Sequence, residues 1–215
     1  MRTITLIAAA LVCLGVGQTP AAELDQWSGF YAGVIANGAV GQMVVEGGGS
    51  TAERGATLSA IAGYRAPIGE FVGGIEAALS LGDVGFLLEG SFYNTSFYSH
   101  EYRSRPAVSF TGSIGIPLDD MLPFAFAGVS VGPGSIDSRY WYVNKPVNQL
   151  PLADMYADAM HVGLTAGVGI DARLTEHILL RGQYTFLRML PSDYRNFATL
   201  SSNIHMLGAG LIYRF

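Results

Sequence analysis

Six polar side chains, drawn from distant parts of the chain, have the chemistry of an internal charge network. They are Arg65, Glu76, Asp171, Arg173, Arg181 and Gln183. A buried charge must meet an opposite charge or hydrogen-bond partners, because removing it from water is otherwise too costly. Glu76 and Arg181 lie in the middle of their segments, so we expect them to form the central pair. Arg65 and Arg173 lie nearer to segment ends, where water can reach them.

Such a network supports two different functions. In the first, it is static, satisfies buried polar groups and fixes the register of neighbouring strands. In the second, it is a gate, in which Glu76 exchanges between Arg181 and Arg65 and opens a small pore. The static network is our expectation, and the gate is the alternative.

The remaining reactive residue types do not form a convincing catalytic site. The four histidines are His100, His161, His177 and His205, and no HExxH motif or i, i+4 histidine pair occurs, so we expect no metal site. Ser201, Ser202 and His205 are near neighbours that could suggest a hydrolase. However, alternate residues of a strand point to opposite faces, and we find no acid to complete the set. We therefore expect no enzyme activity and no cofactor.

The only cysteine, Cys13, lies in a segment that we expect to be removed. A mature chain without thiols excludes disulfides, zinc–thiolate sites and cysteine nucleophiles.

These polar residues need elements that place them inside the protein, and the last eleven residues, HMLGAGLIYRF, show what kind. Alternate positions Phe215, Tyr213, Leu211, Ala209 and Leu207 are all apolar, whereas the positions between them are small, apolar or charged. A period of two indicates a β-strand with two different faces. An aromatic residue at the end of the apolar face is typical of a strand that contacts lipid and ends at the membrane–water boundary.

The composition of the whole chain agrees with a membrane-spanning sheet. Of the 215 residues, 50% are hydrophobic and 13% are charged, and the mean hydropathy is +0.33. After the N-terminal segment, no run approaches the ~20 apolar residues that a transmembrane helix needs. High hydrophobicity diluted by alternation is typical of a transmembrane barrel, and the 28 glycines suit a narrow lumen. The formal charge of −5 leaves no basic surface for nucleic acid.

Residues 1–22 have the features of a secretory signal peptide. Arg2 is the positive start, residues 4–16 are apolar, and small residues precede a cleavage site after Ala22 or Ala21. We therefore expect two parts, a signal peptide over residues 1–22 and a barrel domain over residues 23–215.

Alternation and turn chemistry predict eight crossings in the mature chain. The expected strands are 27–41, 56–65, 70–80, 105–116, 122–132, 160–174, 177–187 and 204–215. Residues 81–104 also have strand character, but both termini are expected in the periplasm, so the number of crossings must be even. We therefore place 81–104 outside the membrane, as a hairpin that continues its flanking strands. Whether Phe124 and Phe126 or Ala125 and Ala127 meet lipid stays open.

The connections between these strands alternate between short and long. Residues 66–69, 117–121 and 175–176 are short, whereas 42–55, 81–104, 133–159 and 188–203 are long. This order is typical of periplasmic turns and extracellular loops in an eight-stranded antiparallel up-and-down transmembrane β-barrel.

Five segments resemble the porin-like surface proteins of alphaproteobacterial outer membranes, within the OmpA-like group of eight-stranded barrels. They are WSGFYAGVIANG, GGIEAALSLGD, LPFAFAGVSVG, VGLTAGVGIDARLTEHILLRGQYTFLRM and the terminal GAGLIYRF. The resemblance implies an abundant outer-membrane surface protein, and Phe215, Tyr213 and Leu211 as a C-terminal signal for the barrel-assembly machinery. No segment resembles the peptidoglycan-binding domain that some of these relatives carry. Some relatives bind haem, so His100, beside Tyr98 and Tyr102, is a candidate haem contact.

We therefore expect a structural outer-membrane barrel with a lumen filled by side chains. The alternatives are a low-conductance, porin-like channel and an adhesin or ligand (haem) binder that uses its outer loops, where aromatic residues such as Tyr98 and Trp141 gather. The expected partners are outer-membrane lipid and lipopolysaccharide, with a possible extracellular ligand and no nucleic acid.

Overall fold

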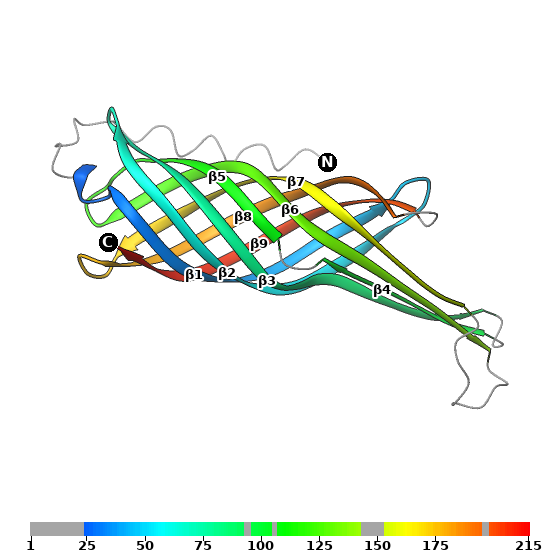
Figure 1. Cartoon of the computed structure of the whole chain (residues 1–215). Coiled ribbons are helices and arrows are strands. Elements are labelled where there is room, and N and C mark those ends of the chain that lie inside the picture. Colours follow the sequence, from blue (N-terminus) through cyan, green and yellow to red (C-terminus); the bar gives the residue numbers. More distant parts are fainter. Residues whose placement is uncertain (1–23, 93–95, 105–106, 143–152, 195–197) are drawn as a thin grey trace, which may run out of the picture.

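The chain forms a long, closed β-barrel, shown by a computed structural model in Figure 1. The structure describes residues 24–92, 96–104, 107–142, 153–194 and 198–215, and the expected signal peptide lies outside these residues. The strands are β1 (Gly29–Val45), β2 (Ser50–Ile68), β3 (Phe71–Phe92), β4 (Ser96–Ser104), β5 (Ala107–Gly115), β6 (Met121–Tyr142), β7 (Ala153–Arg173), β8 (Ile178–Tyr194) and β9 (Ala198–Arg214).

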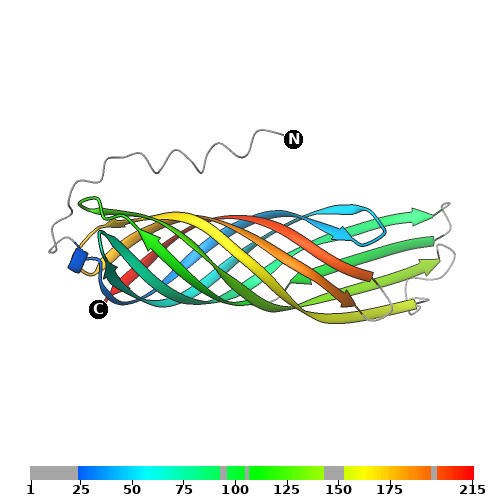
Figure 2. The ribbon, with the colours of Figure 1, turned by 90° about the horizontal axis from the view of Figure 1, so that it is seen from above.

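The nine strands make eight crossings. Strands β4 and β5 both pair with β3 on one side and with β6 on the other, so together they form one crossing. All pairings are antiparallel, and β1 pairs with β9 from Tyr31 opposite Arg214 to Val45 opposite Leu200, which closes the ring (Figure 2). The predicted eight-stranded antiparallel barrel is confirmed.

The barrel has two distinct ends. The near end carries the C-terminus, the first described residues and the turns after β2, β5 and β7, whereas the opposite, far end carries the turn between β1 and β2 (Figures 1 and 2). The near-end turn between Ile68 and Phe71 contains Gly69 at φ 64°, a conformation that glycine adopts without steric cost. The short connections were predicted correctly to within a few residues.

Three of the four long connections, 42–55, 133–159 and 188–203, are mostly strand in their described residues, so the prediction of loops there is wrong. Strands β1 and β2 continue to Val45 and from Ser50, leaving only a tight turn between them. Strands β6, β7, β8 and β9 likewise extend well into segments expected to be loops. The reason is that strands above the membrane keep pairing after their lipid-facing pattern ends, so hydropathy alone marks only the membrane part.

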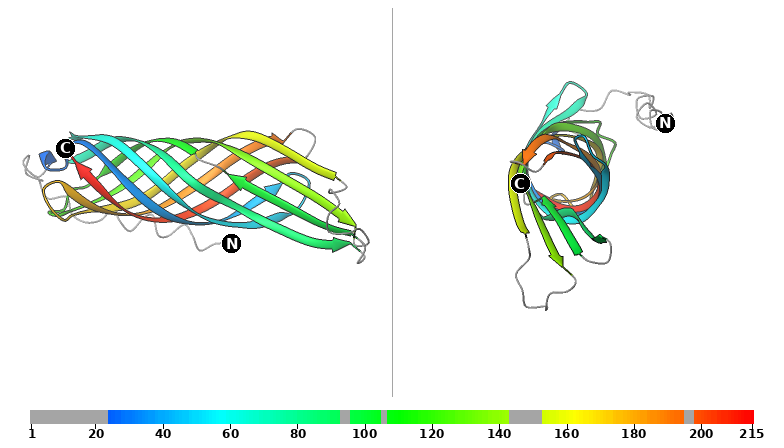
Figure 3. Two further views of the ribbon diagram at one scale, coloured as in Figure 1. Left: turned by 60° about the horizontal axis from the view of Figure 1, so that its bottom comes forward. Right: turned by 90° about the vertical axis from the view of Figure 1, so that its right-hand side faces the viewer.

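Residues 81–104 form the predicted hairpin that continues its flanking strands. Residues 86–92 of β3, β4, 132–142 of β6 and 153–162 of β7 together project past the other strands at the far end, to one side of the barrel (Figure 3). We call this the four-strand extension. Pairing between β2 and β3 stops at Arg54 and Gly85, and pairing between β7 and β8 stops at Gly163 and Met189. Both outer edges of the extension therefore leave the barrel wall.

The outward face of the barrel carries an uninterrupted apolar band. Within the band, every outward position is an alanine, glycine, proline, aliphatic, methionine, phenylalanine or tyrosine residue. The band covers 30–40 of β1, 56–68 of β2, 71–81 of β3, 107–115 of β5, 121–131 of β6, 162–172 of β7, 178–186 of β8 and 207–215 at the C-terminus. Strands of about ten residues, tilted by ~40°, span the ~25 Å of an outer-membrane core. We call these ranges the membrane-spanning part. In the described part of the chain, no helix is long and apolar enough to cross a membrane.

The interior contains the residues that alternate with this band. At the near end, the turn that begins at Leu24 places Leu24 and Trp27 against Tyr31, Leu122 and Ile212, so the start of the described chain plugs the barrel. On β6, Phe124 and Phe126 point inward, and Ala125 and Ala127 face outward, which answers the question left open by the sequence. The lumen is therefore filled with side chains, as expected for eight strands.

Candidate functional site

Inward polar residues of the lumen form three layers between the two ends. Above the near-end plug lies the ionic layer, made by Arg65 of β2, Glu76 of β3, Asp171 of β7 and Arg181 of β8. A hydroxyl-lined chamber follows, and a far-end cluster lies above that. Each side chain of the ionic layer comes from a strand that is paired on both sides, so this layer belongs to the rigid wall of the barrel.

Asp171 is the centre of the ionic layer. Its Oδ2 accepts hydrogen bonds from Arg65 Nη2 at 2.6 Å and Arg181 Nη2 at 2.9 Å, and its Oδ1 accepts from Arg181 Nε at 2.7 Å. Asp171 and Arg181 are direct neighbours across β7 and β8, which explains the two-bond geometry. The side chains of Asp171 and Arg181 are 0% and 1% exposed. Two cations and two anions are thus gathered in one layer.

The predicted pair of Glu76 and Arg181 is one arm of this layer. Arg181 Nη1 donates to Glu76 Oε2 at 2.6 Å, and the hydroxyl of Tyr31 donates to the same oxygen at 2.8 Å. The guanidinium groups of Arg65 and Arg181 also lie against the rings of Tyr31 and Phe124, with centroid distances of 4.8–5.6 Å. The aromatic rings thus fill the space around the charges and keep water away from them.

Two expectations about this layer are corrected. Arg65 was expected near solvent, but it is 3% exposed because Asp171 and the Tyr31 ring enclose it. Arg173 was expected in the lumen network, near a segment end where water can reach it. It lies at the rim of the near end, where it bonds Asp120 and Gln26, so its place in the network is wrong and its access to water is as expected. Arg173 is the last residue of β7. A side chain at the end of a strand can turn to the rim of the barrel, even when its position in the alternating pattern points inward. Gln183 does face the lumen and donates to Thr185 at 3.4 Å.

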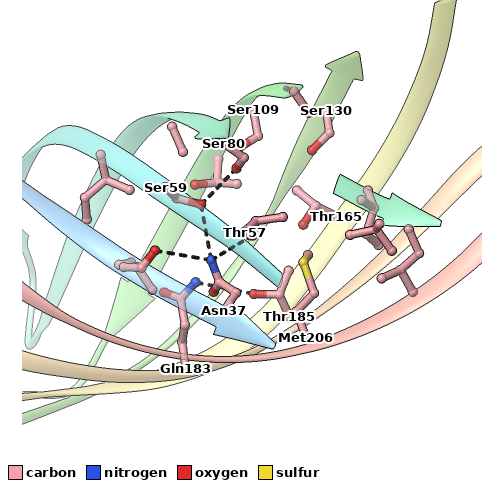
Figure 4. A pocket seen from close by; sticks show the side chains of 18 of the residues that line it. Asn37, Thr57, Ser59, Ser80, Ser109, Ser130, Thr165, Gln183, Thr185 and Met206 are labelled. Carbon is pink, nitrogen blue, oxygen red and sulfur yellow. Dashed lines mark hydrogen bonds between the residues drawn. The ribbon is translucent and has the colours of Figure 1, made fainter. Parts of the chain in front are cut away.

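The chamber above the ionic layer has a volume of about 100 Å³. Its wall carries short polar side chains from several strands, and Figure 4 shows them pointing toward one another. The Nδ2 of Asn37 donates to Thr57 at 3.3 Å and to Ser59 at 3.2 Å, and Ser59 is 2.9 Å from Ser80 (Figure 4). A cavity of this size and polarity can hold several waters. The sequence analysis did not identify the chamber, although its signal was present as serines and threonines at inward positions.

A far-end cluster covers the chamber from the other side. We define it as Glu53, Tyr102, His161, Tyr194 and Ser202, which lie above the membrane-spanning part and are at most 2% exposed. His161 Nε2 is 2.5 Å from the hydroxyl of Tyr194, and Ser202 donates to Glu53 Oε1. Apolar side chains of Met43, Ile136 and Leu200 pack around the two tyrosines. This cluster was also missed, because all its residues except His161 lie in segments expected outside the membrane-spanning strands.

Glu53 has an unusual environment within this cluster. Ser202 is its hydrogen-bond partner, and the other carboxylate oxygen is buried without a partner. Burial raises the pKa of the Glu53 carboxyl from 4.5 to about 7, because desolvation disfavours the charged form. Burial likewise raises the pKa of the Tyr194 hydroxyl to about 12. At neutral pH the Tyr194 hydroxyl is therefore protonated, whereas the Glu53 carboxyl is close to its pKa and is present in both forms.

The suspected hydrolase residues do not converge. Ser202 points inward to Glu53, whereas His205 points outward, with its Nδ1 2.6 Å from the hydroxyl of Tyr184. His100, the candidate haem contact, is partly buried, and its Nδ1 is 2.8 Å from the hydroxyl of Ser138. The side chains of Tyr98 and Trp141 lie outside the described residues.

The C-terminal residues have the predicted faces. Leu211, Tyr213 and Phe215 point outward, with Phe215 73% exposed, and Ile212 between them is buried inside. The ring of Tyr213 packs edge-on against Phe215 at a centroid distance of 5.2 Å. The aromatic side chains at the end of the chain are thus exposed on the outside of the barrel, where lipid or another protein can contact them.

The comparison with family models agrees with this architecture. The family model described as "Outer membrane protein beta-barrel domain" matches residues 9–215. No curated relative matches the sequence. Among solved structures, the chain is similar to Neisserial surface protein A, with 17% identity, a TM-score of 0.49, and coverage of 87% of this chain and 98% of that one. It is also similar to the attachment invasion locus protein of Yersinia pestis, solved with the heparin analogue sucrose octasulfate (13%, 0.48, 87% and 99%). A third similar structure is the outer membrane protease OmpT of Escherichia coli (11%, 0.44, 94% and 99%).

Proposed function

The chain belongs to the outer membrane β-barrel family, and from this premise we propose that it is a structural surface protein of the Gram-negative outer membrane. Its role is mechanical and architectural. The closed sheet anchors in lipid through its apolar band, and the strands above the band present a protein surface outside. The finer placement, among the porin-like surface proteins of alphaproteobacteria, is part of the proposal and rests on the five sequence segments that resemble them.

The packed lumen is the observation that carries a structural role rather than a transport role. Trp27 plugs the near end, Asp171 joins two arginines directly above it, and Tyr194 is fully buried in the far-end cluster. Moving a solute along this path requires the separation of buried charges, which is costly in the low-dielectric interior. A filled lumen of eight strands thus supports anchoring and not diffusion.

Electrical recording in planar lipid bilayers tests this proposal. We expect the purified, refolded barrel to give no reproducible open steps, because the ion pairs of the ionic layer would have to separate before an ion could pass. A variant with Trp27→Ala, Arg65→Ala and Asp171→Ala removes the plug and half of the layer, and it serves as the positive control. Regular open steps in the unmodified protein would overturn the structural role.

The hydroxyl-lined chamber favours one second candidate, a low-conductance channel. The chamber is already polar, and Glu76, at 15% exposure, is the least buried member of the ionic layer beneath it. In this case the bond between Glu76 and Arg181 would be the gate. Open steps that change in size or frequency in Glu76→Ala and in Arg181→Ala would support the channel, and a protein that stays closed in both would exclude it.

We further propose that both termini lie in the periplasm and that the far end faces outward. The turns at the near end are short, whereas at the far end several strands continue well beyond the apolar band. Outer-membrane barrels likewise have short periplasmic turns and longer extracellular segments. Gly49→Cys provides the test, since a side chain there meets no other atom and the mature chain is expected to lack cysteine. A membrane-impermeant thiol reagent should label it on intact cells, whereas labelling only after permeabilisation would reverse the orientation.

The exposed aromatic end of β9 supports a role in assembly. We propose that Phe215, Tyr213 and Leu211 are recognised by the barrel-assembly machinery. Phe215→Ala should lower the amount of folded protein in the outer membrane in cells, while the purified variant refolds normally in detergent. Equal loss in both settings would mean that Phe215 serves stability alone. No catalytic role is part of this proposal, because Ser202 and His205 point to opposite faces.

A further inference from the structure

Two arginines of the barrel stand apart from all the others that the structure describes. Six described arginines bond acidic side chains or backbone carbonyls: Arg65, Arg103, Arg139, Arg173, Arg181 and Arg214. Arg54 and Arg188 are exposed and make no ion pair or hydrogen bond with the described residues. Each is a guanidinium group with five free donors.

Strand register places these two arginines on one sector of the barrel. Arg54 of β2 lies opposite Val40 of β1, and Val40 lies opposite His205 of β9. One step further from the membrane-spanning part, Arg188 of β8 lies opposite Asn203 of β9, which lies opposite Gln42 of β1. Residues directly opposite one another share a face, and this face points outward.

The resulting patch sits directly above lipid-facing residues. We define the polar patch as Arg54, Gln42, Asn203, His205 and Arg188, across β2, β1, β9 and β8. The next outward residues toward the near end, including Leu207 at 70% exposure, belong to the apolar band. The patch therefore lies at the level where the headgroups of the far-side leaflet begin.

The chemistry of the patch fits an anionic headgroup. Guanidinium groups bind phosphate oxygens with two parallel hydrogen bonds, and the amides of Gln42 and Asn203 add neutral donors and acceptors. Three interstrand spacings separate Arg54 from Arg188, which is roughly 15 Å. The arginines can thus hold phosphates at two ends of one wide headgroup. Glu101 of β4 and Asp137 of β6 already pair with Arg103 and Arg139. Arg103 lies in the same row as Arg54, with Gly85 of β3 between them. The exposed acid nearest to Arg54 is Asp83 of β3. It lies two residues before Gly85, the residue directly opposite Arg54.

We propose that the polar patch is a binding site for the phosphorylated disaccharide headgroup of lipopolysaccharide in the outer leaflet. Arg54 and Arg188 hold the two phosphates, and the apolar rows below them contact the acyl chains. This proposal rests on the proposed orientation, in which the far end faces outward. It assigns a specific lipid to the sector of β2, β1, β9 and β8, and it leaves the paired charges of β4 and β6 for other contacts.

Binding of fluorescent lipopolysaccharide to the refolded protein in neutral detergent tests the site. We expect the double variant Arg54→Gln/Arg188→Gln to bind at least about tenfold more weakly than the unmodified protein. Arg103→Gln/Arg139→Gln removes the same net charge from two arginines that already pair with Glu101 and Asp137, and this variant should bind as the unmodified protein does. Heat-modifiable migration on a denaturing gel verifies that each variant is folded. Arg54→Lys/Arg188→Lys keeps the charge without the two-bond geometry and should bind with intermediate affinity.

Each other outcome overturns the site. If both glutamine variants bound lipopolysaccharide equally weakly, only the net charge of the barrel would matter. Unchanged binding after removal of the phosphates from lipopolysaccharide would exclude the arginine contacts, and equal competition by phosphatidylglycerol would exclude a specific headgroup. Labelling of Gly49→Cys only after permeabilisation would instead reject the orientation, while the binding result in detergent would still stand by itself.

Discussion

Asp171 shows how a single side chain can hold several distant strands together. It is fully buried and bonds one arginine of β2 and one of β8, and Arg181 passes the connection on to Glu76 of β3. A buried ionic layer adds less stability than its number of bonds suggests, because each charge loses its hydration. Its clearer effect is to fix the register of the strands that supply it, since a one-residue slip would move each charge to the lipid face.

Removing the charge of Asp171 should therefore lower the stability of the folded barrel strongly. We expect Asp171→Asn to lower the free energy of unfolding by about 3–5 kcal/mol, because Arg65 is left buried without an anion. Urea unfolding of the protein in lipid vesicles measures this. Asp120→Asn, which breaks the exposed pair with Arg173, is the control and should cost under about 1 kcal/mol. Similar losses in both variants would contradict a central role for Asp171.

Glu53 makes the far-end cluster sensitive to pH. The folded protein holds this carboxyl at a pKa of about 7, above its ordinary value of 4.5, so the folded state binds the proton more tightly than the unfolded state. The contribution of Glu53 to stability should therefore be most favourable at low pH and should fall by up to about 3 kcal/mol between pH 4.5 and pH 8. Glu53→Gln should flatten this dependence and be more stable than the unmodified protein at pH 8. Unfolding curves at several pH values test this, and an unchanged profile in the variant would contradict it.

At the scale of the element, β9 shows how one strand contacts lipid with one face and the barrel interior with the other. Its outward residues Leu207, Leu211 and Tyr213 face lipid, whereas Ile204 and Ile212 enter the interior. Further along the same outward face, Ser201 and Asn203 lie above the apolar band. The change from apolar to polar residues along the outward face of β9 therefore marks the membrane boundary.

A charge moved along this face should show the boundary. Leu211→Arg places a cation in the apolar band and should cost about 2–4 kcal/mol, whereas Ser201→Arg, on the same face above the band, should cost about 0–1 kcal/mol. Unfolding from lipid vesicles gives both values. Equal costs would mean that the membrane does not cover Leu211.

At the scale of the whole molecule, the barrel consists of a closed wall and an extension that leaves it. The wall is closed by pairing between β1 and β9, so every strand within it has two neighbours. The four-strand extension has two edges that are not paired with the adjoining barrel strands, at 86–92 and 153–162. Edge strands of this kind open more readily than paired ones.

Hydrogen exchange should separate these two regions. We expect amides of 153–162 to exchange faster than amides of 163–173 on the same strand, because only the latter are paired on both sides. Exchange of the protein in detergent, read by mass spectrometry or NMR, provides the measurement. Uniform protection along β7 would mean that a neighbour covers the edge.

The sequence by itself determined the fold. Alternation along the chain, the number of crossings and the apolar face that ends at Phe215 are local properties, and a period of two converts them directly into faces of a sheet. The same alternation placed Glu76, Asp171 and Arg181 inside, and the resemblance of five segments indicated the family.

Only the tertiary structure decided which inward residues meet. Asp171 and not Glu76 is the centre of the ionic layer, and Arg173 leaves it, because height along the barrel depends on the stagger of the strands as well as on parity. The same stagger brings Arg54 and Arg188 into one patch although 134 positions separate them in sequence. The far-end cluster also depends on strands that continue above the membrane, where no solvent contrast marks their faces in the sequence.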